Sequence, residues 1–429
     1  MAEVKYANEF HDEVVRQLMQ YGVECYLVND NNIQRTKREL VKESLILVYN
    51  EHCINSVCNS NVQKFLERAL ECNVQIWPIA LDRDARTPMG IISNRQSYDV
   101  WEQLRCRDLN ERYLITLAKM FSRKIIARVY PTCYCEKGEI FLSHRRIDGE
   151  EITAKIYERI LVQVREATPF RDVLNVKAGD EAQSVIDEAM ENSDVFVFIH
   201  TPESGKSDWI LKELRFALLR NIPILWIQID NADIDSLRIK PSDSPHFKYS
   251  TEDFSKAGKL TVIIDEILEK SFELIMERSN QVLGYMEYIE SMFGDSLSAI
   301  DEKKMIYHIS MERKGYHYPQ RNIEQYYQLY GRTPSRNDAS KLKDELENTK
   351  VDSVAILTNR VVSSSLREGV VFDSIHDFCY YWDRYITGDK KRTEKMEIVI
   401  SGAFPDSDEI FKQSLSDALV LFSKAIIPV

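Results

Sequence analysis

Strand and helix patterns alternate along the chain between residues 139 and 230. The runs EIFLSH, DVFVFIH and IPILWIQID are short and largely apolar, as buried strands of a parallel sheet are. The segments EEITAKIYERILVQV, DEAQSVIDEAMENS and SDWILKEL repeat their apolar residues at helical spacing. This alternation predicts an α/β fold with a flavodoxin-like parallel sheet and helices on both faces. Such sheets bind ligands at the carboxyl ends of their strands.

A similar strand–helix–strand pattern lies nearer the N-terminus. Residues 44–82 align with residues 193–230, and both segments end on an aspartate after a strand that contains a tryptophan. Any two units of this kind share hydrophobic periodicity, but the shared details favour a true repeat. In the alignment Phe65 occupies the position of Glu213 and Asn61 that of Trp209. We therefore expect two tandem α/β copies, the first without the side chains of the second.

The segment 279–395 is less regular. DSVAILTNRVV predicts one strand, and FDSIHDFCYYWDRYI predicts an aromatic amphipathic helix. The charged stretch TGDKKRTEK then precedes another apolar strand, MEIVISGAF. We expect a mixed, partly helical region here, whose role the pattern does not indicate.

The composition narrows the classes of partner. Hydrophobic residues make up 44% of the chain and charged residues 29%, which is typical of a soluble globular protein. The net charge of −12 argues against nucleic acid and anionic membrane surfaces as partners, and no run approaches the ~20 apolar residues of a membrane span. The eight cysteines form no CxxC pair and the histidines have no zinc-ligand spacing, so we expect free thiols in a cytoplasmic protein and no metal site.

The segment SDWILKEL raises a question of its own. Trp209 and Glu213 are one helical turn apart and therefore share a face. A separate stripe faces the core; it consists of Ile210, Leu214, Ala217 and Leu218. A large ring at the edge of a core either fills a gap or lines a pocket.

Three motifs occur in a fixed order along this part of the chain. They are IFLSHRRIDGEE, FRDVLNVKAGDEAQSVIDEAMENSD and SDWILKEL. Together they resemble the Toll/interleukin-1 receptor (TIR) domain family, in the style of its plant and bacterial members, over residues 138–276. Some TIR domains only assemble, whereas others cleave NAD+, and the enzymes carry a glutamate at the position of Glu213. The resemblance thus implies that Glu213 is the catalytic residue of an NAD+ nucleosidase, with NAD+ as substrate rather than cofactor.

The resemblance also implies a set of substrate-binding residues. Trp209 would stack on the nicotinamide ring, and Ser143 would meet the ribose or a phosphate. Arg145 and Arg146 would pair with the pyrophosphate, although surface charge is an equally good reading of both. Phe170 and Asp172 begin a loop that in the family shapes the pocket, and residues 172–180 would contact a neighbouring subunit.

The C-terminal segment resembles the start of a SLOG domain, a Rossmann-like nucleotide sensor. It contains the strand and the SGAFP loop, but not the glycine-rich second loop of that family, so the sensor is incomplete here or continues beyond the chain. An ordinary βαβ unit is the alternative. The sequence thus predicts four parts: residues 1–131, a degenerate TIR-like domain; 138–276, the catalytic domain; 279–395; and 396–429, the SLOG-like start.

These expectations combine into one reading of the chain. It is a cytoplasmic bacterial enzyme that hydrolyses NAD+ to nicotinamide and ADP-ribose, in a linear or cyclic form. Self-assembly would activate it in anti-phage defence, and a nucleotide-derived signal would bind the C-terminal segment. A non-catalytic TIR scaffold and a nucleotide-binding sensor without turnover are the alternatives. Neither alternative needs a carboxylate at position 213.

Overall fold

The protein is described by a computed structural model. It describes residues 2–26, 44–50, 60–88, 90–106, 111–163, 167–171, 182–219, 222–240, 244–293, 297–301, 304–313, 321–332, 338, 341–342, 345–346, 349, 353–358, 370–373, 379–386 and 395–402. The chain divides into two compact units, residues 1–129 and residues 130–429.

The first unit contains a parallel sheet. Its strand order, within the described residues, is β1-β2-β3, and both strand pairs are parallel. The strands are β1 (Leu45–Asn50), β2 (Gln75–Ala80) and β3 (Tyr98–Asp99), and the helices are α1 (Ala2–Gln20), α3 (Ser60–Glu71), α4 (Val100–Arg105) and α5 (Glu111–Val129). The expected βαβ unit is therefore present, with α3 between β1 and β2. Phe65, which aligns with Glu213, packs against the buried cluster around Leu66 and Ile76. That this unit is a degenerate repeat stays a prediction.

A five-stranded parallel sheet forms the first part of the second unit. Its order is β5-β4-β6-β7-β8, and all four strand pairs are parallel. Numbered along the sheet's own sequence this is the order 2-1-3-4-5, the flavodoxin-like arrangement, so the expected fold class is confirmed. The strands are β4 (Gly138–His144), β5 (Ala167–Phe170), β6 (Val195–His200), β7 (Ile224–Ile229) and β8 (His246–Tyr249).

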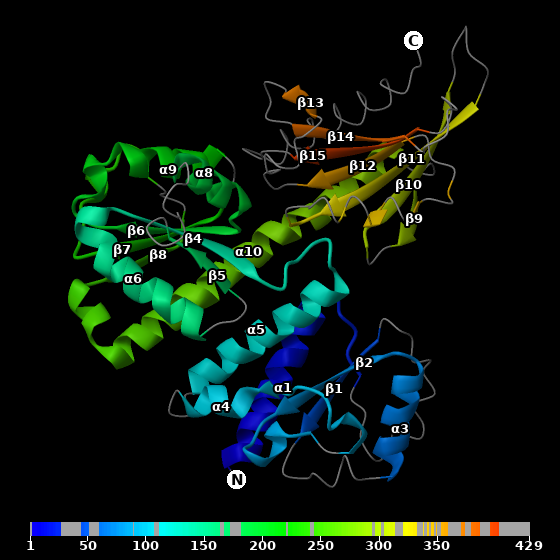
Figure 1. The fold of residues 1–429 in the computed structure, drawn as a ribbon, viewed down its shortest axis with the longest axis horizontal. Coiled ribbons are helices and arrows are strands. Elements are labelled where there is room, and N and C mark those ends of the chain that lie inside the picture. The colour runs from blue at the N-terminus through cyan, green and yellow to red at the C-terminus, as the bar shows by residue number, and fades with distance from the viewer. Residues whose placement is uncertain are drawn as a thin grey trace. The chain divides into compact units, whose positions relative to one another are not determined.

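Helices cover both faces of this sheet (Figure 1). One face carries α6 (Arg146–Gln163) and α10 (Ala257–Phe293), and the other carries α8 (Ala182–Asn192) and α9 (Asp208–Leu219). All residues of β6 and β7 are buried, because strands covered on both faces have no solvent side. The core beneath α8 and α9 contains Phe141, Phe198, Trp226 and the helix residues Ile210 and Leu214.

A second sheet of the same unit mixes parallel and antiparallel pairs. Its order is β13-β14-β15-β12-β11-β10-β9. The strands are β9 (Leu297–Asp301), β10 (Ile306–Arg313), β11 (Arg321–Tyr330), β12 (Ser353–Thr358), β13 (Val370–Asp373), β14 (Cys379–Ile386) and β15 (Lys395–Gly402).

Two expectations about the C-terminal region are wrong. Residues 379–386 of the aromatic segment expected to be helical form strand β14 instead, because they pair antiparallel with β15 and aromatic side chains suit a strand. The boundary expected at residue 396 falls inside a sheet, since β15 lies between β14 and β12. The expected strands at β12 and β15 are present. Residues 403–429 of the SLOG-like segment lie outside the described residues.

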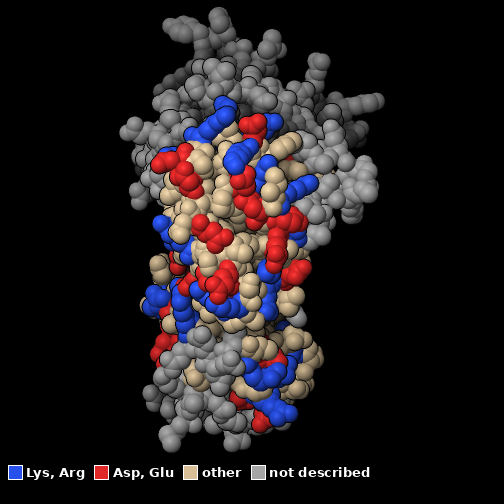
Figure 2. Space-filling view, turned by 90° about the vertical axis from the view of Figure 1, so that its left-hand side faces the viewer, with Lys and Arg blue, Asp and Glu red and all other residues tan. Residues whose placement is uncertain are grey.

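Charged side chains of both signs are scattered over the described part of the surface in Figure 2. Figure 2 shows Lys and Arg interspersed with Asp and Glu on one face, without a broad area of either sign. This mixture agrees with the exclusion of an extended basic surface for nucleic acid on that face. Among the residues that the structure describes, no helix is long and apolar enough to cross a membrane.

Candidate functional site

The site lies where the strand order of the five-stranded sheet reverses. Strand β4 leads outward to β5, whereas β6, on its other side, leads to β7 and β8. The helices that follow the two central strands therefore leave in opposite directions and open a crevice at the carboxyl ends, where such folds bind ligands. Ser143 is the next-to-last residue of β4, lies on the side of α8 and α9, and pairs in register with Phe198 of β6.

Helix α9 brings a carboxylate to this crevice. Ile210, Leu214 and Ala217 are buried in the core, which orients the helix and leaves Glu213 half-buried at its side. The Ser143 hydroxyl donates a hydrogen bond of 2.6 Å to Glu213 Oε2. Ser143 is itself buried, so this contact holds one carboxylate oxygen near the carboxyl end of β4.

Trp209 lies one turn before Glu213 and is largely open to solvent. Its side chain is 53% exposed, and Lys212 Nζ lies 4.7 Å from the ring centroid in a cation–π arrangement. The helical stripe expected for the core is right for three of its four residues. Leu218 is 41% exposed, because at 100° per residue it is rotated about 80° from Ile210, away from the core side.

The two candidate arginines have different surroundings. Arg145 is half-buried, and its guanidinium Nη1 donates a 3.1 Å hydrogen bond to Ser207 Oγ, directly before α9. Ser207 Oγ also accepts from the backbone N–H of Ile210 and so caps the helix. Arg146 begins α6 and is exposed. The structure therefore brings Arg145 to the N-terminus of α9.

The residues at the end of β5 and after it have three different surroundings. Phe170 stacks on Phe141, with ring centroids 5.3 Å apart and an interplanar angle of 16°. Arg171 is buried and forms an ion pair with Glu150 of α6. Asp172 and the loop 172–180 lie outside the described residues.

The ion pair of Arg171 belongs to a network that sequence reasoning missed. Glu150 Oε2 lies 2.9 Å from Nε2 of the buried His144. Burial raises the pKa of Glu150, but the hydrogen bond to His144 and the charge of Arg171 outweigh it, so the pKa lies below its usual range. The network ties the first turn of α6 to the ends of β4 and β5. His144 stands in the FLSH motif, but its partner is set by the tertiary fold.

A buried aromatic column beside the crevice was also missed. His200 stacks between Phe198 and Trp226, with ring centroids 5.5 Å away on each side, and His246 stacks on Trp226 at 4.3 Å. His200 is fully buried, and neither of its ring nitrogens has a hydrogen-bond partner. Burial, together with the charge of His246, lowers the pKa of His200 to about 4. The imidazole is therefore neutral at pH 7.

The described part of the chain holds no cluster suited to a metal ion. No group of three or more His, Cys, Asp or Glu side chains with the required proximity occurs among these residues. The chemistry that this crevice can offer is that of one oriented carboxylate, flanked by an exposed aromatic ring and a guanidinium.

Comparison with known proteins assigns a family to this part of the chain. The family model of the TIR domain matches residues 140–260, which places a TIR domain there. A probable 2′ cyclic ADP-D-ribose synthase from Brachypodium distachyon, BdTIR, is 24% identical over 163 residues, which are 36% of this chain and 71% of that protein. The TIR resemblance expected from the three motifs is thus confirmed for this segment.

A solved structure gives a weaker likeness. It is the metazoan TIR-STING receptor from C. gigas in complex with 2′,3′-cGAMP. The match covers 67% of the present chain and 86% of the receptor chain, with 11% sequence identity and a TM-score of 0.27. A TM-score this low supports no argument about the present chain.

Proposed function

We propose that the TIR domain of this chain cleaves the bond between nicotinamide and ribose in NAD+, with Glu213 as the catalytic carboxylate. The observation that carries this proposal is the hydrogen bond from Ser143 to Glu213 at the strand-order reversal of the sheet. The TIR match and the relative named as a probable cyclic ADP-ribose synthase support it.

The reaction needs little more than charge stabilisation. The nicotinamide of NAD+ is a pyridinium, so the electron pair of the breaking C1′–N bond neutralises it and no general acid is required. Positive charge develops on ribose C1′, and a fixed carboxylate next to it stabilises the transition state. Water then adds to C1′ and releases a proton, which gives ADP-ribose; addition of a hydroxyl of the same molecule gives a cyclic product.

The neighbouring side chains take binding roles in this proposal. Ser143 is a positioning residue, because its hydroxyl orients the Glu213 carboxylate. Trp209 offers a ring face to the nicotinamide, and the nearby ammonium of Lys212 indicates that the ring is placed to accept a cation. Arg145 lies at the N-terminus of α9, where its guanidinium and the positive end of the helix suit the pyrophosphate.

The test is the substitution Glu213→Gln in the full-length protein. Glutamine keeps the size and the hydrogen bond from Ser143 but removes the charge, so nicotinamide release from NAD+ should fall about 10²–10³-fold. Glu158→Gln, at an exposed position of α6, is the matched control and should leave the rate unchanged. Chromatography of the products measures both rates and separates ADP-ribose from a cyclic form.

Two outcomes favour the alternatives. Absence of nicotinamide release from the natural protein, with a folded TIR domain, supports a scaffold. Calorimetric binding of NAD+ without any product supports a sensor. Activity that survives unchanged in Glu213→Gln contradicts the proposed role of this residue. The defence role and a nucleotide signal at the C-terminal segment rest on resemblance and stay predictions.

A further inference from the structure

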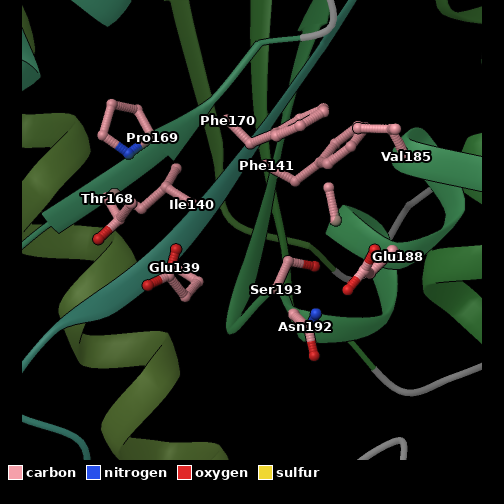
Figure 3. Close-up of a pocket in the computed structure, with 11 residues that line it drawn as sticks. Glu139, Ile140, Phe141, Thr168, Pro169, Phe170, Val185, Glu188, Asn192 and Ser193 are labelled. Carbon is pink, nitrogen blue, oxygen red and sulfur yellow. The ribbon is translucent and has the colours of Figure 1, made fainter. Parts of the chain in front are cut away.

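A cavity lies between helix α8 and strands β4 and β5 (Figure 3). Its volume is about 460 Å³, within the range of roughly 300–1,000 Å³ that small-molecule sites occupy. We call it the α8 cavity. Its lining residues come from β4, β5, α8 and the residue after α8: Glu139, Ile140, Phe141, Thr168, Pro169, Phe170, Val185, Glu188, Ala189, Asn192 and Ser193.

One side of the α8 cavity is aromatic. Phe170 and Phe141 stack there, and Phe196 continues the column, with its centroid 5.3 Å from that of Phe141 and an angle of 10°. Figure 3 shows both lining rings close to Val185 of α8. Because Phe170 and Phe196 cover its two faces, Phe141 can offer only its edge to the cavity. An apolar wall that includes ring edges suits a planar ring, which gains edge-to-face contact in addition to burial.

The other side of the cavity is polar and acidic. Figure 3 places the carboxylate of Glu139 beside Thr168, and that of Glu188 near Asn192 and Ser193. Burial raises the pKa of Glu139, although a hydrogen bond from the Thr168 side chain works against this. None of the described residues that line the cavity is Lys or Arg. The charge of Lys137, outside the lining, acts on Glu139, but the lining itself presents two carboxylates, which repel a phosphate and accept hydrogen bonds from N–H donors.

The α8 cavity is separate from the Ser143–Glu213 pair. Its polar residues lie at the amino ends of the strands, where Glu139 and Asp194 exchange hydrogen bonds of 2.9 and 2.8 Å. Glu139 precedes Ser143 by four residues in β4, which corresponds to about 13 Å along a strand. Glu213 does not line the cavity.

We propose that the α8 cavity binds a planar heteroaromatic ring that carries N–H donors and no phosphate. The ring packs against Phe141 and Phe170, and its N–H groups donate to Glu139 and Glu188. Nicotinamide, the leaving group of the proposed reaction, and free adenine both have this chemistry. The site goes beyond the proposed function, since ring binding requires neither Glu213 nor bond cleavage.

Calorimetric titration of the full-length protein tests this site. The probes are nicotinamide and adenine, each compared with its phosphate-bearing counterpart, nicotinamide mononucleotide or adenosine monophosphate. At least one free ring should bind, and its counterpart should bind at least about tenfold more weakly, a difference of 1.4 kcal/mol. The affinity for the free ring should be the same in Glu213→Gln, which separates this site from the catalytic crevice.

Substitutions of lining residues locate the binding. Ala189→Phe fills the cavity and should abolish it, while Ala257→Phe, the same change at the exposed start of α10, should not. Glu139→Gln keeps the shape and should weaken binding about tenfold, because a charge-assisted hydrogen bond becomes a neutral one. If Ala189→Phe does not fold, the affinity of Glu139→Gln for the free ring tests the location of the site. The proposal is overturned if neither ring binds, if the phosphate-bearing counterparts bind equally well, or if the cavity variants bind as the natural protein does.

Discussion

The imidazole of His200 is buried between two aromatic rings although it can carry a charge. Neither ring nitrogen has a hydrogen-bond partner, and the nearest charged groups include Asp148 and Asp233, which favour protonation, and His246, which opposes it. Burial dominates and lowers the pKa of His200 from 6.5 to about 4. In the unfolded chain the imidazole takes up a proton below pH 6.5, whereas the native state does so only near pH 4. The unfolding free energy therefore falls as the pH drops through this window.

The substitution His200→Phe should remove this pH dependence. Phenylalanine keeps an aromatic ring between Phe198 and Trp226 and removes the two unpaired nitrogens. Relative to the natural protein, the variant should gain about 2 kcal/mol in unfolding free energy between pH 7 and pH 5, since one strongly shifted group contributes up to about 1.4 kcal/mol per pH unit. Denaturant unfolding at both pH values measures the difference. Equal pH dependence in the two proteins would show that His200 titrates normally.

At the scale of elements, the position of α9 depends on a close contact before its first turn. The turn η3 (Ser204–Lys206) packs against the turn η4 (Ile234–Ser236), which follows β7. A Cβ atom at Gly205 would lie 2.5 Å from Ser236 Oγ and 2.6 Å from its backbone oxygen. Only glycine fits without a backbone shift. Three residues later α9 begins, and with it the segment that carries Trp209 and Glu213.

The substitution Gly205→Ala should therefore reduce both stability and activity. The clash involves backbone as well as side chain, so we expect a loss of about 1–3 kcal/mol in unfolding free energy. Nicotinamide release should also fall, because a backbone shift at Gly205 displaces the start of α9, which carries Glu213. Gly258→Ala is the matched control: no atom lies within 4 Å of its added Cβ, and alanine favours the helix by about 0.5–1 kcal/mol. Thermal unfolding and the NAD+ assay compare the two variants, and equal behaviour would refute the contact argument.

At the scale of the molecule, the long helix α10 links the two sheets of the second unit. It contacts β4, β6 and β7 of the TIR domain and β11 of the second sheet. Near its middle, Gly331 at the end of β11 donates its backbone N–H to Thr132 O at 3.0 Å. A Cβ at Gly331 would lie 2.7 Å from Ser279 O of α10 and 2.8 Å from Cys133 O. Backbone from three distant segments thus meets at one glycine, which gives the unit a continuous connection between its parts.

Assembly is the molecular-scale prediction for activity. Trp209 is 53% exposed beside the half-buried Glu213, and a carboxylate stabilises a developing cation far better when water is excluded. We expect a second copy to cover this side of α9, so the rate of nicotinamide release per molecule should rise with protein concentration. Initial rates over a hundredfold range of concentration measure this. A rate per molecule that stays constant over the whole range would mean that a single chain is sufficient.

Local pattern alone determined much of the secondary structure. Strands β4, β6 and β7 and helices α6, α8 and α9 follow from the spacing of apolar residues, because burial on a strand or a helix requires a period set by backbone geometry. The shared face of Trp209 and Glu213 follows from the same geometry. The flavodoxin-like class follows from the alternation of these elements, since parallel strands need helical crossovers.

Only the tertiary structure decided which distant residues meet. Ser143 and Glu213 are 70 positions apart, and the hydrogen bond between them arises because β4 lies beside β6 and α9 packs over both. The aromatic segment of β14 became a strand because β15 offered a partner, a choice that local propensity does not make. The isolation of His200 and the space beneath α8 likewise depend on how side chains from several elements fill a volume. Periodicity specifies which side of a helix or strand is buried. Only the packing of the folded chain specifies which residues that side contacts.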